Sequence, residues 1–248
     1  MKFQKKLAVT ALFAALAAAS VVAQAQTVRI ANQGDALSMD PHSLNESLQL
    51  SVTSNVYEPL VGRNKDLSLA PALATSWKQT SPTVWRFELR KGVQFHDGTP
   101  FTARDVVFSL NRAKGENAQV KSLLSSMEEA KAVDDLTVQV KTKGPNLIFP
   151  NNLTNIFIMS EKWARANGAA ETQDAGTKTE NGATRAVNGT GPYVLASREV
   201  DSKTVMKLNP DYWGKGQFPL QVTELIYLPI KSPATRVAAL LSGEVDFA

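Results

Sequence analysis

The sequence predicts a mixed α/β fold, with helices and sheets stacked in layers of the α/β or α+β kind. Strand-type and helix-type segments are interspersed along the whole chain, without an internal repeat. Within residues 69–110 an alternating strand, a tight turn and a capped helix follow one another directly. Residues 222–230 are apolar on both faces, which is typical of a strand at the centre of a sheet.

The N-terminus is predicted to be a secretory signal peptide, residues 1–25. Lys2, Lys5 and Lys6 precede an apolar run over residues 7–22, and small residues then favour cleavage after Ala25. A membrane anchor is disfavoured because this run is shorter than the roughly 20 residues that a spanning helix needs. No cysteine follows the run, which excludes attachment through a lipidated N-terminal cysteine. We therefore expect the protein to be exported to a Gram-negative periplasm.

The composition excludes several classes of function. The chain has no cysteine, so disulfides, thiol nucleophiles and cysteine metal sites are not available to it. The formal net charge of +4 includes the three signal-peptide lysines, and residues 26–248 carry the remaining +1. No basic patch indicates nucleic-acid binding, and no second apolar span indicates a membrane protein.

The elements of the first half follow from alternation and from turn chemistry. Residues 27–31 alternate and should form the first strand, which leads into a loop over 32–41 and a helix over 46–56. Residues 84–89 alternate as a half-buried strand, and residues 96–98 form a tight turn. Thr102, with Asp105 three residues later, should cap a helix that stops at Gly115. The segments 128–133 and 136–142 should pair as a hairpin whose turn contains Asp134 and Asp135.

The second half is predicted in the same way. Residues 145–153 should form a short helix, 156–159 a short buried strand, and 161–166 a helical turn capped by Ser160 and closed by Gly168. Residues 169–188 lose the hydrophobic period, which favours a mobile surface loop. Strands are expected over 193–197, 203–208 and 222–230, then a helix over 232–241 ended by Gly243, and the opening of a strand at 245–247.

The residue types that carry catalysis are arranged without a catalytic pattern. The two histidines, His42 and His96, lack metal-ligand spacing, and we expect a structural hydrogen bond for His96. The adjacent acidic pairs at 128–129 and 134–135 should point to opposite faces of a hairpin, which fits a solvated turn. No serine stands in a nucleophile-elbow context, and residues 189–191 lack the lysine of a phosphate-binding loop. Three of the four tryptophans, Trp77, Trp85 and Trp163, lie in apolar patterns and are expected in the core, and Trp213 is expected to have a structural role at a strand end.

Four sequence blocks in one order carry a resemblance to a known family. They are ALATSW followed by GVQFHDGTPFTARDVVFS, then NGTGPYVL at 188–195, NPDYWG at 209–214, and residues 235–247 with their LLSGEVDF ending. Together they resemble the substrate-binding proteins of ABC transporters of the dipeptide, oligopeptide and nickel type, solute-binding protein family 5. Members are roughly twice as long, so the resemblance implies that this chain is an N-terminal portion.

The resemblance implies an architecture and a mode of action. Residues 26–58 and 188–248 would form lobe I of a type II periplasmic binding protein, residues 59–187 an extra α+β domain beside it, and the second lobe would be missing. The protein would be a monomeric receptor that binds a peptide or other small solute without a cofactor and delivers it to the permease subunits of an ABC importer. Ligands of such receptors lie between two lobes that close by a hinge. This chain would then supply one wall of the cleft.

Because ligands of such folds gather at the carboxyl ends of strands, the loop after the first strand should supply that wall. We expect Asn32, Gln33, Gly34 and Asp35 to contact the ligand through a close backbone, amides and a carboxylate, and His42 to contact it from the same loop. In peptide-binding relatives the acidic partner of the ligand's amino group lies in the missing lobe. Three alternatives stay open, namely a receptor for nickel chelates or other small solutes, an exported hydrolase with a truncated site, and a non-functional fragment.

Overall fold

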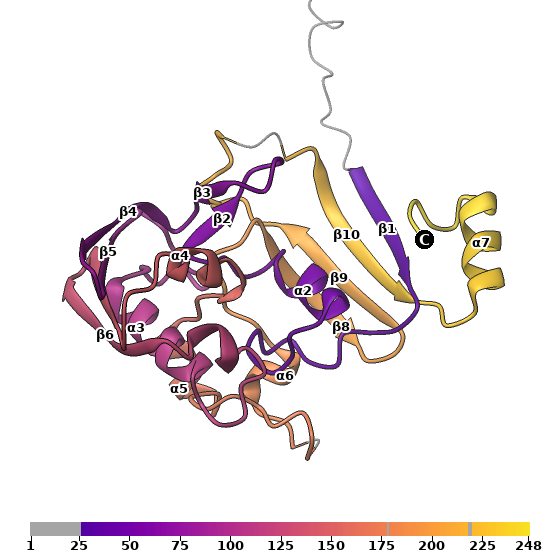
Figure 1. Ribbon diagram of the computed structural model, residues 1–248. Coiled ribbons are helices and arrows are strands. Elements are labelled where there is room, and N and C mark those ends of the chain that lie inside the picture. The colour runs from indigo at the N-terminus through magenta and orange to yellow at the C-terminus, as the bar shows by residue number, and fades with distance from the viewer. Residues whose placement is uncertain (1–25, 178, 218–219) are drawn as a thin grey trace, which may run out of the picture.

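The structure is a computed structural model that describes residues 26–177, 179–217 and 220–248. The predicted signal peptide therefore lies outside the described residues. The fold of the described residues is mixed α/β, as predicted, with two four-stranded sheets and one two-stranded sheet (Figure 1). None of the helices in the described part of the chain has the length and apolar character of a bilayer span.

The first sheet combines the beginning and the end of the chain. Its order is β1 (Gln26–Asn32), β10 (Val222–Pro229), β9 (Lys203–Leu208) and β8 (Tyr193–Glu199). β1 and β10 are parallel and the other pairs are antiparallel. Because β10 lies between β1 and β9, it occupies the interior position that its apolar sequence predicts. The predicted opening of a strand near the C-terminus appears as a parallel bridge between Phe247 and Ile30, on the free side of β1.

The second sheet is built from the middle of the chain. Its order is β4 (Ala74–Ser81), β5 (Val84–Leu89), β7 (Thr137–Thr142) and β6 (Met127–Asp134), all antiparallel. Helix α3 (Ala103–Ala113) packs on β6 and β7 and begins with the predicted capping box of Thr102 and Asp105. Phe87, Val106 and Leu110 belong to the core between them. Their burial supplies most of the stabilisation here, at about 2 kcal/mol per large apolar side chain.

The remaining elements are short. They are α2 (Ser47–Thr53), β2 (Val61–Arg63), β3 (Leu69–Pro71), the 3₁₀ turns Lys121–Leu124 and Leu153–Asn155, α4 (Phe149–Asn152), α5 (Glu161–Ala166), α6 (Gly182–Arg185) and α7 (Pro233–Ser242). α7 ends at Gly243, whose φ of 75° is left-handed, as its sequence position predicts.

Helix α2 is shorter than predicted, and the returning chain explains why. The carbonyl of Asn55 accepts from Tyr193 N and that of Val56 accepts from Gly191 N, so neither carbonyl points along a continued helix. Gly189 lies so close to this backbone that a Cβ atom there would be 1.7 Å from the Val56 oxygen. The start of β8 is thereby fixed against the end of α2.

Two sequence predictions are wrong. Residues 156–159 are buried but form no strand, because their backbone groups bond to scattered partners and only Phe157 forms a bridge, with Pro59. The described part of residues 169–188 is not a mobile surface loop, since Ala169 and Ala183 are fully buried and α6 lies within it. The polar sequence of this segment suggested solvent exposure, but some of its polar side chains, such as Gln173, are buried and hydrogen-bonded.

Candidate functional site

The parallel strands β1 and β10 end at the same edge of the first sheet. The register pairs Asn32 with Pro229, and the Asn32 carbonyl accepts a 2.7 Å hydrogen bond from Ile230 N just beyond β10. The chain then leaves β1 toward α2 and leaves β10 toward α7. This edge is therefore where a crevice is expected in an open α/β sheet, provided that the two helices cover opposite faces.

The packing places the two helices against side chains of β1 that point to opposite faces of the sheet. Val28 and Ile30 of β1 belong to the core that also contains Leu48 and Val52 of α2. Ala31, the neighbour of Ile30 with the opposite orientation, instead packs with Ala239 of α7, together with Val245, Leu228 and Ile230. Figure 1 shows α2 in front of the sheet and α7 beyond β1 at the outer edge.

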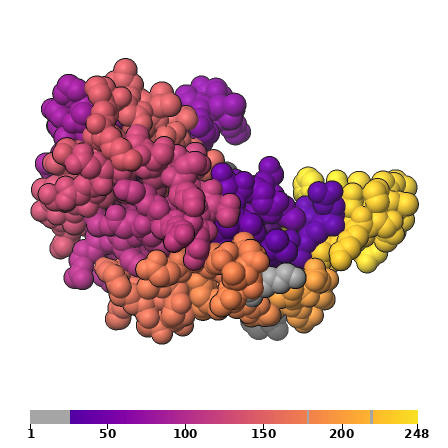
Figure 2. All heavy atoms as spheres, turned by 60° about the horizontal axis from the view of Figure 1, so that its bottom comes forward, coloured from indigo at the N-terminus to yellow at the C-terminus, as the bar shows by residue number. Residues whose placement is uncertain are grey.

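An open hollow of about 430 Å³ lies at this edge between the two helices. It is lined by Ala31, Asn32 and Gln33 of β1 and its exit, by Ser47, Leu48 and Ser51 of α2, by Arg236 of α7, and by Ala248. Figure 2 shows the yellow C-terminal part standing out from the body of the molecule, with the indigo N-terminal residues against it. The hollow offers amides, hydroxyls and one guanidinium, which can donate to and accept from a polar solute.

The structure separates the five predicted ligand residues. Asn32 and Gln33 line the hollow, and their side chains make no hydrogen bond to another described residue. Gly34 is half-buried beside α2, where a Cβ atom would touch the Leu48 side chain at 3.7 Å. Asp35 and His42 are instead engaged in internal contacts.

Asp35 is held by the hairpin of β8 and β9. Its Oδ1 accepts from Arg198 Nη1 at 3.1 Å, and its Oδ2 accepts from Asp201 N at 2.9 Å. Arg198 also donates to the Ala36 carbonyl and to Thr204 Oγ1. The side chains of Asp35 and Arg198 are only 9% and 3% exposed. Both oxygens of the carboxylate are thus used to fix the loop after β1, so they are not free for a solute.

His42 belongs to a buried polar cluster with Asp40 and Arg112. Arg112 donates to both Asp40 oxygens, at 2.8 and 2.6 Å, in a bidentate ion pair whose side chains are at most 1% exposed. Burial tends to raise the pKa of Asp40, but Arg112 lowers it below its usual value. His42 is fully buried, with Nε2 2.8 Å from the Phe157 carbonyl oxygen and Nδ1 3.0 Å from Arg112 Nη1.

These contacts assign His42 a tautomer. A guanidinium can only donate, so Nδ1 accepts from Arg112 and Nε2–H donates to the carbonyl. Burial, then the Arg112 charge, lowers the pKa of His42 from 6.5 to about 4. The cluster joins the first loop to α3 and to Gln173. Both ring nitrogens of His42 have protein partners, and the side chain is not exposed to solvent. Across the described ranges no three His, Asp or Glu side chains gather closely enough to hold a metal ion.

A second buried carboxylate lies away from this edge. Glu58 accepts from Thr190 Oγ1 at 2.8 Å, Tyr212 Oη at 2.9 Å and Trp213 Nε1 at 2.8 Å, and burial raises its pKa. The Arg90 guanidinium lies 4.0 Å from the centre of the Trp213 ring. Trp213 therefore has a structural role here. His96 is likewise structural, as predicted, with Nε2 3.1 Å from the Gly191 carbonyl oxygen.

Sequence reasoning missed three polar residues of the hollow, Ser47, Ser51 and Arg236. The serines are four residues apart on α2 and therefore share one face of the helix. The sequence pattern of the expected helix did not indicate that this face lies at the carboxyl edge of β1 and β10. Arg236 had a clear signal, because it is the one charged residue in the predicted helix over 232–241.

Comparisons with known proteins support the fold and the family. Residues 68–248 match the model for "Bacterial extracellular solute-binding proteins, family 5 Middle". The glutathione-binding protein GsiB of Pectobacterium atrosepticum is 33% identical over the whole of this chain, and the periplasmic oligopeptide-binding protein OppA of Escherichia coli is 28% identical over 95% of it. The structure of Haemophilus influenzae OppA in complex with the peptide RPPGFSPFR superposes on 90% of this chain with a TM-score of 0.76 and 25% identity.

The chain spans about half the length of the relatives that it matches. It covers 46% of GsiB, 45% of Escherichia coli OppA and 45% of the Haemophilus influenzae OppA chain. The matched family model itself covers most of the present sequence, from residue 68 to residue 248. The chain belongs to the bacterial extracellular solute-binding proteins of family 5.

Proposed function

We propose that this protein acts as an extracytoplasmic solute receptor of an ABC importer, binds di- or oligopeptides without covalent chemistry, and delivers them to a membrane permease. The observation that carries the proposal is the hollow at the joint carboxyl edge of β1 and β10, between helices on opposite faces. Family membership supports a receptor, and relatives named for oligopeptides and glutathione favour peptide-like solutes.

The lining of the hollow fits a peptide backbone. A peptide presents alternating N–H donors and C=O acceptors, and the amides of Asn32 and Gln33 can both donate and accept. The hydroxyls of Ser47 and Ser51 add two further groups of this kind on the facing helix. Such contacts need no particular side chain on the peptide, which suits a receptor that takes peptides of varied sequence.

The proposal includes an organisation of the chain. Residues 26–58 and 188–248 form lobe I, which carries this wall, and residues 59–187 form an additional domain beside it. The membership of the two four-stranded sheets supports this division, because one uses strands from both ends of the chain and the other only strands from 74–142. Of the sequence-predicted ligand residues we retain Asn32, Gln33 and Gly34. Export to the periplasm through a signal peptide cleaved after Ala25 is part of the same proposal.

Calorimetric titration of the purified protein with a pool of di- and tripeptides tests this function. We expect weak binding, of millimolar affinity or weaker, because this chain supplies one wall of the cleft, and mass spectrometry should recover the bound peptides intact. Gln33→Ala should weaken binding about 2- to 10-fold, the effect of one neutral hydrogen bond. Gln94→Ala, an exposed glutamine outside the hollow, is the matched control and should bind as the wild type does. Cleaved peptides, or no binding of any peptide, would contradict the proposal.

A further inference from the structure

Arg236 is the one charged side chain among the described residues that line the hollow. The one carboxylate among the predicted ligand residues, Asp35, is paired with Arg198 and has both oxygens engaged. None of the salt bridges among the described residues involves Arg236. The wall therefore presents one cationic side chain, without a salt-bridge partner among the described residues, to whatever binds there.

Contacts within the chain hold the guanidinium of Arg236 in place. Nη1 donates to the carbonyl oxygens of Ile230 at 2.7 Å and Lys231 at 3.1 Å, in the connection between β10 and α7. The side chain is half-buried. Nε and Nη2 donate to no acceptor among the described residues. These two nitrogens form one edge of the planar group, and that edge matches the two oxygens of a carboxylate.

We propose that Arg236 anchors a carboxylate group of the solute, so that this wall selects peptides with a free acid. The inference rests on the proposed function and specifies its substrate class. Arg236 is positioned before binding, since two backbone carbonyls already fix its orientation, and little side-chain freedom is lost when the carboxylate arrives. The carboxylate comes either from the C-terminus of a peptide or from an acidic side chain, and the same edge accepts both.

Three peptides distinguish these sources on the unmodified protein. Trialanine carries a C-terminal carboxylate, trialanine amide carries none, and Ala-Glu-Ala amide carries only a side-chain carboxylate. We expect trialanine to bind about 10-fold more tightly than its amide, the effect of one charge-assisted hydrogen-bonded pair at a partly exposed site. Recovery of the affinity with Ala-Glu-Ala amide would show that a side-chain carboxylate also reaches Arg236. Failure to recover it would assign the contact to the C-terminus.

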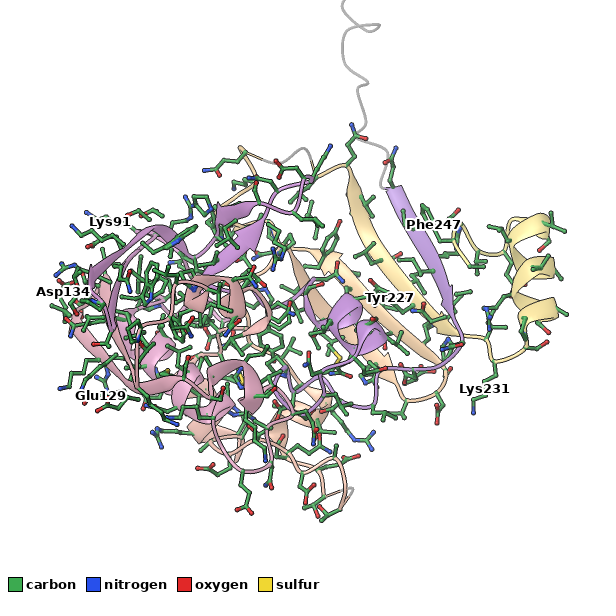
Figure 3. The ribbon with its side chains drawn as sticks, viewed as in Figure 1. Lys91, Glu129, Asp134, Tyr227, Lys231 and Phe247 are labelled. Carbon is green, nitrogen blue, oxygen red and sulfur yellow. The ribbon has the colours of Figure 1, made fainter. Side chains whose placement is uncertain are left out.

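Two variants connect the effect to Arg236. Arg236→Met should remove the difference between trialanine and its amide, and Arg236→Lys should restore only part of it, because an ammonium lacks the bidentate edge. Lys231→Met is the matched control, because it removes an exposed positive charge that lies outside the lining and extends away from the sheet in Figure 3. It should keep the difference. Urea unfolding of each variant separates a lost contact from a damaged fold.

The outcomes separate this inference from the proposed function. If the wild type binds trialanine and its amide within 2-fold of each other, the role of Arg236 is refuted while the receptor function stands. If Arg236→Met keeps the 10-fold difference in a folded protein, the carboxylate is held elsewhere and the inference is likewise refuted. If no peptide binds at all, the proposed function fails first and the inference fails with it.

Discussion

The buried histidine of the Asp40–Arg112 cluster makes the stability of this protein depend on pH in a defined window. His42 has a pKa of about 4 in the folded protein and 6.5 in the unfolded chain, chiefly because of burial and then the Arg112 charge. As the pH falls below 6.5 the unfolded chain takes up a proton that the folded protein does not. The stabilisation from His42 is therefore complete above pH 6.5 and is lost progressively down to about pH 4.

The size of the effect follows from these two values. Each unit of pKa difference corresponds to about 1.4 kcal/mol, so at pH 5 protonation of the unfolded chain costs about 2 kcal/mol of folding stability relative to pH 7. His42→Gln removes the titrating group. The difference in unfolding free energy between the wild type and His42→Gln should therefore shrink by about 2 kcal/mol between pH 7 and pH 5.

Urea unfolding at the two pH values measures this difference. Subtracting the variant from the wild type cancels the contributions of the other titrating groups, including His96, whose pKa burial also lowers. His96→Gln is the matched control and should keep the His42 contribution. If wild type and His42→Gln lose the same stability between pH 7 and pH 5, the argument that burial holds His42 neutral is refuted.

Three further substitutions test the assignments of structural roles. Asp35→Asn should cost about 3 kcal/mol in urea unfolding because it leaves the Arg198 charge buried without its partner; a loss below 1 kcal/mol would mean that the carboxylate is available to a ligand after all. Gly189→Ala should cost about 3 kcal/mol through overpacking, whereas Gly144→Ala, where nothing lies within 4 Å of the added Cβ, should stay within about 0.5 kcal/mol of the wild type. Glu58→Gln should cost about 1–3 kcal/mol, because one of the two acceptor oxygens becomes a donor, and indole fluorescence should report a looser Trp213; unchanged stability and emission would contradict this network.

Much of the fold could be predicted because local patterns agree with the packing. The alternation at 84–89 and the capping box at Thr102 correspond to β5 and α3, and the apolar run at 222–230 corresponds to the interior strand β10. β4 was not identified from its pattern. β4 lies at the edge of its sheet, and only Ala74 in it is fully buried. Because most of its side chains contact solvent, its sequence is polar and lacks the apolar alternation that identifies a strand.

The candidate site could be predicted only in part. The rule that ligands gather at the carboxyl ends of strands led to the loop after β1, where Asn32 and Gln33 line the hollow. The rule could not show that Asp35 forms an ion pair with Arg198, 163 positions later in the chain. It also could not show that the His42 ring is hydrogen-bonded to Arg112 of helix α3. Such long-range ion pairs leave no local pattern. A carboxylate that is free for a ligand and one that fixes a loop look the same in the sequence.

The position of the solute is the most direct test of the account. Backbone amide shifts of the isotopically labelled protein should be followed by NMR during titration with trialanine. We predict that the largest changes cluster at Asn32, Gln33, Ser47 and Ser51, with the Arg236 side-chain Nε–H shifting in the same titration. Changes concentrated around Arg90 and Trp213, with the residues at the ends of β1 and β10 unaffected, would contradict the placement of the ligand wall at this edge.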